Sequence, residues 1–311
     1  MVNLYGEVPL ILTTDYRVNA LAVRDTKDEV YQQIVSDLEA AMDLLEPTFT
    51  TGERTQVNQY TAVALLARVQ LYLQNWEQAE VLSSQIIDQS STYEILEDPN
   101  EVFLKNSREA IWQLSPLGGG SILTNTKEGA SFIIHPIFSF LSQMKLTPGF
   151  VASLEAEDAR LIHWVGVHQS TGSYYANKYK IQNSTEDITE YSMVLRLAEQ
   201  FLIRAEARVM QNNLTGAISD LDVIRSRAGL ELIADMNPNI GKEALVHIIM
   251  EERNRELFTE WGHRWLDLKR TGMAGEVLGA ENPLWQETDV LYPIPEAERL
   301  KNPNLTQNNG Y

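Results

Sequence analysis

The sequence predicts an all-α protein in which helical hairpins resembling tetratricopeptide repeats form a scaffold around a long, loop-rich insertion. Three observations support this prediction. Apolar residues recur at helical spacing in several segments, one pattern of paired helices occurs twice, and roughly a hundred residues between the two copies have no helical period. Because the chain has 311 residues and 44% of them are apolar, it can bury a large core. An ordered helical protein is therefore expected.

The first amphipathic helix starts after residue 26. Thr26 and Glu29 have the spacing of a capping box, and apolar residues then recur at helical intervals until Pro47 ends the pattern. A single repeat cannot bury its own apolar face, so we expect this helix to belong to a hairpin whose partner helix precedes residue 1. The apolar opening MVNLYGEVPLIL, which has no helix start signal, agrees with an upstream segment having been removed.

A second helical hairpin follows and then recurs. Residues 60–73 are apolar almost all round, as expected of a helix packed between neighbours, and Asn75 and Trp76 break the pattern before a partner helix. Aligning residues 57–88 with 195–226 gives a unit of roughly 30 residues, as in tetratricopeptide repeats, although the full consensus is not met. The matched pairs are Val63 and Phe201, Leu65 and Ile203, Ala67 and Ala205, Leu71 and Val209, Asn75 and Asn213, Ala79 and Ala217, and Ile86 and Ile224.

These patterns divide one expected domain, residues 1–311, into functional parts. The helical scaffold is expected at 26–90 and 192–272, including a further helix from Glu243 to Thr259. Residues 110–190 form a variable binding region that is rich in Gly, Ser, Thr and aromatic residues and begins with a strand-like run at Ala110–Leu114. The aperiodic tail at 280–311 should wrap over the helices.

Composition excludes several classes of function. Lys and Arg number 25 against 43 Asp and Glu, which gives a formal charge of −18. This charge would repel nucleic acid and other polyanions, and it disfavours direct binding to anionic lipid. The absence of cysteine excludes disulfides, thiolate metal sites and a cysteine nucleophile within these residues. No uncharged apolar run approaches the ~20 residues that cross a bilayer. A neutral ligand such as a sugar remains compatible with this charge.

Motif searches predict no catalytic residue, no metal site and no cofactor. The five histidines form no HExxH or other compact ligand pattern, and GGG at 118–120 lacks the Lys-Ser/Thr of a phosphate loop, so these glycines should form a turn. Glu256 and Glu260 are expected one turn apart on a helix. Such neighbours form ion pairs, here Glu251 with Arg255 and Glu260 with Arg264, rather than the opposed carboxylates that glycoside hydrolysis needs.

Aromatic residues are the strongest candidates for ligand contact, because a sugar ring packs its C–H faces on an aromatic plane while its hydroxyls need polar partners. We predict a binding site at residues that lie in polar loop sequence: Trp164, Tyr174, Tyr175, Arg160, His168 and Asn177. The alternative for Trp164, within LIHWVGV, is a buried strand residue. Tyr174 and Tyr175 point to opposite faces if the chain is extended, so one of them should belong to the core.

Four segments, in order, resemble the SusD/RagB family of nutrient-binding proteins. The opening LYGEVPLIL and the run LRLAEQFLIRAEA with its following hairpin are similar to family segments. EERNRELFTEWGHRWLDLKRTG, from Glu251 to Gly272, resembles the most recognisable family stretch, and LYPIPEAERLKNPNLTQNNGY resembles its terminus. The chain is therefore identified as the carboxy-terminal two-thirds of a family member, shortened at its N-terminus.

The resemblance implies a cell-surface protein of the outer membrane that binds oligosaccharides or polysaccharides and is not an enzyme. Its partner would be a SusC-like TonB-dependent transporter, and its lipid anchor would lie in an N-terminal segment outside these residues. Peptide capture by a member of the same family, and a TPR-like protein-binding scaffold, are the alternatives. A glycan-cleaving enzyme would require two opposed acidic residues at the aromatic cleft, for which Glu155, Glu157, Asp158 and Asp187 are the candidates.

Overall fold

The computed structural model describes residues 1–117, 122–142 and 144–311, which form two compact units. One unit combines Met1–Ala40 with Arg264–Tyr311, and the other is Ala41–His263. The chain is mainly helical, which confirms the predicted fold class. The glycine turn expected at 118–120 lies outside the described residues, and the single domain expected over 1–311 stays a prediction.

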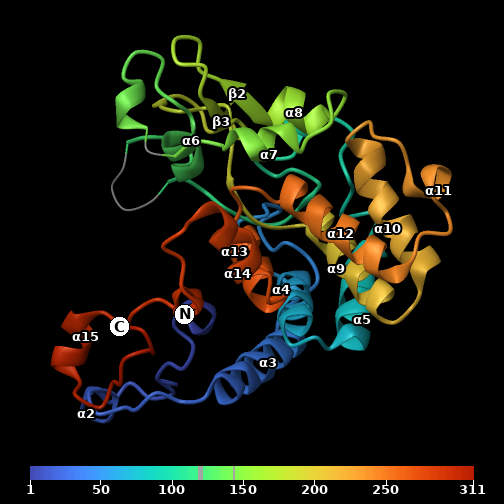
Figure 1. Cartoon of the computed structure of the whole chain (residues 1–311). Coiled ribbons are helices and arrows are strands. Elements are labelled where there is room, and N and C mark those ends of the chain that lie inside the picture. The colour runs from blue at the N-terminus through green and yellow to red at the C-terminus, as the bar shows by residue number, and fades with distance from the viewer. Residues whose placement is uncertain (118–121, 143) are drawn as a thin grey trace. The chain divides into compact units, whose positions relative to one another are not determined.

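The two predicted hairpins form the scaffold of the larger unit. The first consists of helices α4 (Gln59–Tyr72) and α5 (Trp76–Ile87), and the second of α9 (Leu197–Met210) and α10 (Leu214–Arg227). Helix α5 packs against α9, so the two hairpins stack into one layer in which each helix contacts its neighbour (Figure 1). The stacking explains why α4 is apolar on most of its surface.

The repeats match in backbone geometry as well as in sequence. Gln74 and Asn212 occupy equivalent turn positions and have φ angles of 58° and 64°. The next residues, Asn75 and Asn213, each donate their backbone N–H to the carbonyl oxygen five residues earlier. Both turns therefore use one left-handed residue to reverse the chain.

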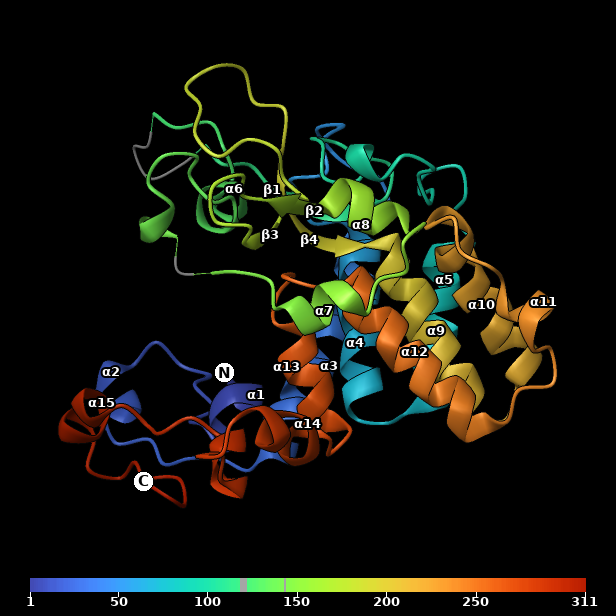
Figure 2. The same cartoon turned by 45° about the horizontal axis from the view of Figure 1, so that its top comes forward.

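Small residues let the scaffold helices approach closely. Ala67, Ala79, Ala205 and Ala217 are completely buried, and so are several of the large residues in the matched pairs, among them Leu71, Ile86 and Ile224. Helix α12 (Lys242–Glu256) packs against α9 and closes the core on that side (Figure 2). The predicted continuation of this helix to Thr259 is wrong, because the chain leaves the helix at Leu257.

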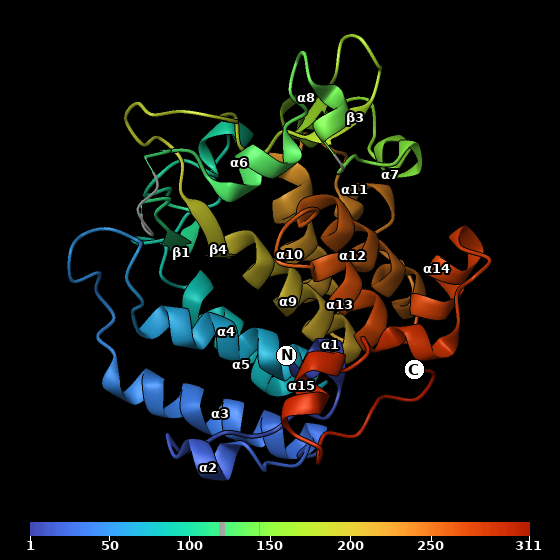
Figure 3. The same cartoon turned by 90° about the vertical axis from the view of Figure 1, so that its left-hand side faces the viewer.

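A two-stranded antiparallel sheet joins the loop region to the scaffold. Strand β1 (Ala110–Leu114) matches the prediction and pairs with β4 (Ser192–Arg196), with Trp112 opposite Leu195. Residues 192–196 were expected to begin the helical scaffold; they form a strand because Met193 and Leu195 alternate into the core. Figure 3 shows β4 running directly into α9.

Short elements fold the loop-rich region onto its own apolar core. This core gathers Phe103, Trp164, Tyr179, Met193 and Phe258 from loop, helix, strand and turn segments. The short elements are η1 (Pro99–Glu101), α6 (Lys127–Phe132), η2 (Ser139–Leu141), α7 (Pro148–Ala152), α8 (Ala159–Trp164), β2 (Val165–Val167) and β3 (Tyr174–Ala176). Helix α11 (Ile233–Met236) follows α10.

The smaller unit joins the two ends of the chain. Its elements are α1 (Val2–Tyr5), α2 (Tyr16–Asn19), α14 (Ala274–Glu281), η3 (Glu287–Val290) and α15 (Glu296–Lys301), together with the larger parts of α3 (Lys27–Leu44) and α13 (His263–Arg270), which cross the unit boundary. Glu29 accepts hydrogen bonds from the backbone and hydroxyl of Thr26, and its N–H donates to that hydroxyl, which confirms the capping box.

The C-terminal tail packs on the N-terminal segment of the same unit. The side-chain amides of Asn302 and Asn304 donate to the carbonyl oxygens of Ala22 and Leu21, and Asn308 donates to that of Tyr5. The asparagines of the NPNLTQN segment thus satisfy backbone carbonyls of a stretch that has no sheet partner. Across the described ranges, no helix is both long and apolar enough to cross a membrane.

Candidate ligand-binding site

The hairpin β2–β3 carries two of the predicted site residues, Tyr174 and Tyr175. Gly166 pairs with Tyr175 and Val167 with Tyr174, so the two tyrosines point to opposite faces as predicted. Tyr174 packs against the loop-region core, and the ring of Tyr175 lies on the backbone of Gly166, where an added Cβ would come within 2.2 Å of it. Both rings are half-buried. Neither is a freely exposed platform.

His168 and Asn177 flank this hairpin. His168 is almost buried; its Nδ1 lies 3.0 Å from the hydroxyl of Thr171 and its Nε2 lies 3.1 Å from the carbonyl oxygen of Pro136. The ring therefore ties the hairpin turn to the loop that follows α6. Asn177 is half-buried and donates its backbone N–H to the carbonyl oxygen of Trp164 at 2.8 Å.

Trp164 does not present a face to a ligand, and its prediction as a stacking residue is corrected here. It is completely buried as the last residue of α8, where its Nε1 donates to the carbonyl oxygen of Pro99 at 2.9 Å. Phe103 packs edge-on at 5.6 Å between ring centres, and the ammonium of Lys178 lies 4.7 Å from the indole centre. The alternative of a buried position is confirmed, although at a helix end rather than within a strand.

Arg160 is corrected in the same way, because its side chain is also completely buried. Its guanidinium holds Asp158 through two bonds at 2.8 and 2.9 Å and reaches Glu252 at 2.6 Å and Glu256 at 3.2 Å. With every one of these bonds made inside the protein, Arg160 stabilises the start of α8. Asp158, one of the acidic residues considered for glycan cleavage, is buried and ion-paired with Arg160.

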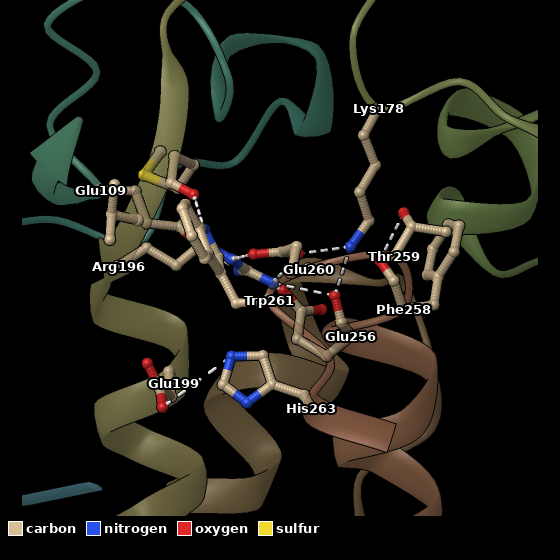
Figure 4. A network of polar contacts seen from close by, with 12 residues as sticks. Glu109, Lys178, Arg196, Glu199, Glu256, Phe258, Thr259, Glu260, Trp261 and His263 are labelled. Carbon is tan, nitrogen blue, oxygen red and sulfur yellow. Dashed lines mark hydrogen bonds and ion pairs between the residues drawn. The ribbon is translucent and has the colours of Figure 1, made fainter. Parts of the chain in front are cut away.

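Arg160 belongs to a buried ion network that joins the loop region to the scaffold. Glu256, at the end of α12, accepts from Arg196 at 2.6 Å (Figure 4). It also accepts from Arg227 and from Arg160. The sequence predicted ion pairs between neighbours along one helix, but Glu256 is completely buried and pairs with arginines from other elements. Its members are Glu109, Asp158, Arg160, Lys178, Arg196, Arg225, Arg227, Glu252, Glu256 and Glu260.

Two carboxylates of the network, Glu256 and Glu260, are held in their charged form. Burial raises the pKa of Glu256, but the guanidiniums of Arg227, Arg196 and Arg160 outweigh burial and hold this pKa well below its usual range. Glu260 lies beyond the helix rather than one turn along it, and its pKa is also lowered because Arg196 and Lys178 outweigh burial. A carboxyl that stays charged across the working pH range cannot act as a proton donor.

Lys178 couples the network to the aromatic core. Its ammonium donates to the backbone carbonyl of Glu256 at 2.8 Å and to Glu260, and it lies 4.1 Å from the centre of the Phe258 ring. Burial lowers the pKa of Lys178 to about 8, against the opposing effect of Glu260. Because Lys178 follows β3 by two residues, this contact fixes the base of the β2–β3 hairpin.

The exposed aromatic surface of the loop region lies elsewhere, at residues that sequence reasoning missed. Phe138 and Phe140 are 47% and 78% exposed, and their rings meet edge-to-face with centres 6.1 Å apart. His135 lies beside Phe138, with ring centres 5.0 Å apart. We call these three residues the aromatic platform. The sequence signal was the run IFSFL, in which large apolar residues stand in a loop without a helical or strand period.

Two features suit the platform to a ligand. The Nδ1 of His135 accepts the backbone N–H groups of Ile137 and Phe138, both at 3.1 Å, so the proton of the neutral ring sits on Nε2 and leaves a donor on the other edge. From residue 129 to 154 the sequence contains no Asp or Glu, in a chain with a formal charge of −18. The platform thus combines apolar faces, a fixed donor and low local charge.

The turn after α12 is backbone-strained. Thr259 and Trp261 adopt φ angles of 58° and 43°, a region that side chains with a Cβ adopt at a cost of about 1–3 kcal/mol each. The hydroxyl of Thr259 donates to the carbonyl oxygen of Phe258 at 2.7 Å, and the indole of Trp261 donates to that of Met193 at 2.6 Å. These bonds and the contacts of Glu260 hold the turn in place (Figure 4).

Comparison with known proteins agrees with this architecture. The pattern of the SusD family matches residues 164–311, and a related pattern described as "Starch-binding associating with outer membrane" matches residues 1–71. The chain belongs to the SusD/RagB family. The resemblance predicted from the four sequence segments is thus confirmed. Members of the SusD family are, in general, carbohydrate-binding proteins rather than enzymes.

SusD-like proteins from Formosa agariphila are among the similar sequences. The SusD-like protein P38 is 34% identical over 141 residues, which cover 43% of this chain and 28% of that protein. The SusD-like protein P2 is 26% identical over an alignment that covers all of this chain and 71% of the relative. The chain therefore spans about 71% of the length of the second relative.

Solved SusD structures show the same fold. A SusD superfamily protein from Bacteroides vulgatus superposes with a TM-score of 0.85 at 20% identity, covering 100% of this chain and 74% of the other. A laminarin-binding SusD-like protein superposes with a TM-score of 0.79 at 23% identity, covering 100% of this chain and 75% of the other. The surface glycan-binding protein A of Bacteroides uniformis superposes with a TM-score of 0.76 at 22% identity, covering 99% of this chain and 74% of the other.

Within the described part of the chain, no group of three or more His, Asp or Glu residues is arranged to hold a metal ion. The remaining acidic candidates for glycan cleavage, Glu155, Glu157 and Asp187, are exposed. Glu155 lies 3.6 Å from Arg225, at the edge of the buried network.

Proposed function

We propose that this SusD-family chain captures glycans at the bacterial outer membrane, does not cleave them, and delivers them to a TonB-dependent transporter. The observation that carries the proposal is the exposed pair Phe138 and Phe140, held beside a fixed donor on His135. Large exposed aromatic rings on a loop are costly in water, so they point to a partner that covers them. A sugar ring offers an apolar face of matching size.

The chemistry of the platform favours a glycan over other ligands. A sugar needs an aromatic plane for its C–H face and a polar group at the ring edge, and Phe138 with the Nε2–H of His135 supplies both. Tyr175 and Asn177, half-buried on the neighbouring hairpin, are retained in the proposed site as edge contacts, together with Tyr174 and His168 as supports. Trp164 and Arg160 are omitted.

The names of related proteins support the same ligand class. One structural neighbour is described as laminarin-binding and another as a surface glycan-binding protein, and the pattern at the N-terminus is described as starch-binding. We infer that this chain likewise takes a neutral glycan, since its formal charge of −18 would oppose a polyanionic one.

Location and partner belong to the same proposal. The pattern matched at residues 1–71 is described as associating with the outer membrane, which supports residence there. We infer attachment at the cell surface through an N-terminal lipid, outside these residues, and docking on a SusC-like transporter that imports the captured oligosaccharide. A formal charge of −18 does not favour direct binding to anionic lipid, which is consistent with tethering by an anchor.

Calorimetry tests binding, and reducing-end release tests cleavage, in the same samples. The protein is titrated with laminarin and starch oligosaccharides and, as the rival ligand class, with a mixed tryptic peptide digest. The proposal predicts saturable binding of at least one glycan with no increase in reducing ends over several hours. Glycan cleavage would overturn the non-catalytic assignment, and binding of peptides but of no glycan would identify a peptide-capturing family member.

A further inference from the structure

A second concave site lies next to the aromatic platform, between helix α6 and the strained turn after α12. It encloses about 160 Å³. This volume is below the roughly 300–1,000 Å³ of pockets for drug-sized ligands, so it has room for a single ring. The lining residues are Glu128, Phe132, Tyr179, Met193, Thr259, Glu260 and Trp261. We call this site the Trp261 pocket.

Trp261 presents a half-exposed indole to this site. The residue is 50% exposed, although its Nε1 is fixed by the bond to the carbonyl oxygen of Met193 at 2.6 Å. Its left-handed backbone, with φ at 43°, is held by the turn rather than preferred by the residue. A tryptophan that is both exposed and held in one orientation provides a rigid apolar plane at low entropic cost.

Two polar groups of the pocket have capacity left for a ligand. The phenol oxygen of Tyr179, a residue only 6% exposed, accepts the backbone N–H of Met193 at 2.9 Å. The described residues supply no acceptor for its own hydroxyl hydrogen. Glu128 uses its Oε2 to accept the hydroxyl of Ser192 at 2.7 Å, and no donor in the described part of the chain reaches its Oε1. The pocket thus offers one free donor and one free acceptor.

From this arrangement we propose that the Trp261 pocket binds one neutral sugar unit. A hydroxyl group both donates and accepts, so a single sugar hydroxyl, or two adjacent ones, can satisfy Glu128 and Tyr179 while the ring stacks on Trp261. Anionic groups are disfavoured by the two carboxylates of the pocket. Glu260 leaves no free oxygen for a cationic ligand, because it already accepts from Lys178 and Arg196 on both of its oxygens.

Chain connectivity places this pocket beside the platform. Phe132 lines the pocket and His135 belongs to the platform. The two residues are three positions apart, so their Cα atoms lie at most ~11 Å apart. One oligosaccharide can therefore cover both sites. This inference rests on the proposed glycan function and deepens it: the pocket holds one unit of a chain whose neighbours stack on the platform.

Fluorine NMR of protein labelled with 5-fluorotryptophan reports on the pocket separately from the platform. The Trp261 resonance is assigned with the variant Trp261→Phe, and the labelled protein is titrated with laminaripentaose and maltopentaose. We expect this resonance to shift saturably with at least one pentaose, whereas the resonance of buried Trp164 stays unchanged. Trp261→Ala should weaken calorimetric binding of that pentaose about tenfold, and Trp261→Phe by less.

The Glu128→Gln variant tests the hydroxyl contact without removing the aromatic plane. The amide can still accept from Ser192 but replaces the free acceptor by a donor, so a weakening of severalfold is expected. Pentaose binding that is lost in Phe138→Ala/Phe140→Ala but unchanged in Trp261→Ala, with no shift of the Trp261 resonance, overturns the pocket and leaves the platform intact. A Trp261 shift that persists in the platform variant with the pentaose affinity of the parent supports the pocket and contradicts the platform. The absence of binding by either pentaose contradicts both.

Discussion

His135 fixes the position of Phe138: its Nδ1 accepts the backbone N–H of Phe138 at 3.1 Å, and the two ring centres lie 5.0 Å apart. One side chain thus shapes the loop and stands beside the ring that the loop exposes. The same bond places the ring proton of the neutral imidazole on Nε2. We infer that His135 both orients the platform and contacts the glycan.

Replacing His135 by alanine should therefore weaken glycan binding without unfolding the protein. The variant loses the two backbone bonds that shape the loop and one ligand donor, and a hydrogen bond contributes about 0.5–1.5 kcal/mol, so a loss of roughly tenfold in affinity is expected. The free energy of unfolding should change by less than about 1 kcal/mol because the loop is exposed. Calorimetry and urea denaturation measure the two quantities, and unchanged affinity would remove His135 from the site.

The Trp164→Ala substitution should lower the free energy of unfolding. Truncating a completely buried tryptophan removes its packing against Phe103 and its bond to Pro99, which costs about 3–5 kcal/mol. Ile162 is a matched control on the same helix, because it is 64% exposed, and Ile162→Ala should change the free energy of unfolding by no more than about 0.5 kcal/mol. Urea denaturation compares the variants. A stable Trp164→Ala protein that had lost only glycan binding would return Trp164 to the binding face.

The scaffold could be predicted from the sequence because the two hairpins have the same spacing of small and large apolar residues. The matched alanines and large apolar residues recur at one offset, and each pair is determined by local helix packing. The family segments agreed with this pattern. Strand β4 was missed because its five residues continue without a break into the apolar run of α9, and five residues are too few to separate a period of two from one of 3.6.

The candidate site was only partly predictable. Tyr174 and Tyr175 follow the alternation of a strand, so their opposite orientations could be deduced. The burial of Trp164 and Arg160 could not be deduced from the sequence, because it depends on partners far along the chain, such as Pro99 and Glu252. Exposure of Phe138 and Phe140 likewise depends on how the loop closes, which no local period encodes.

Glu256 should be among the most stability-sensitive residues of the chain. Glu256→Gln keeps the shape but leaves Arg160, Arg196 and Arg227 facing a neutral amide in a buried site, and disruption of a buried ion pair costs about 3–5 kcal/mol. Glu251→Gln is the matched control, since Glu251 forms the predicted i,i+4 pair with Arg255 at 3.5 Å near the surface, worth about 0.2–0.5 kcal/mol. Equal effects of the two substitutions would show that the network is not a stability determinant.

The lowered pKa of Glu199 predicts that the folded protein loses stability in acid. Burial raises the pKa of Glu199, but Arg68, which binds it at 2.6 Å, together with His263 and Arg253, outweighs burial and lowers the pKa to about 2 from the usual 4.5. A lowered folded-state pKa contributes stability above the unfolded pKa and loses it as the pH falls. The contribution, about 3 kcal/mol, should therefore be lost between about pH 4.5 and 2.

The Glu199→Gln variant isolates this contribution. It should be less stable than the parent at pH 7, because Arg68 loses its charged partner, and its stability should fall less steeply between about pH 4.5 and 2. Urea midpoints measured across that range for both proteins give the slopes. Parallel curves would show that Glu199 does not titrate with folding.

Glycan affinity of the platform double variant tests the account most directly. Phe138→Ala/Phe140→Ala is compared with the parent and with Ile162→Ala, an exposed apolar residue on α8, in calorimetric titrations with the oligosaccharide that the parent binds. The account predicts a loss of at least ~30-fold, because two stacking rings are removed, with unchanged affinity in the control and unchanged unfolding free energy in both. Affinity equal to that of the parent would contradict glycan capture by this surface.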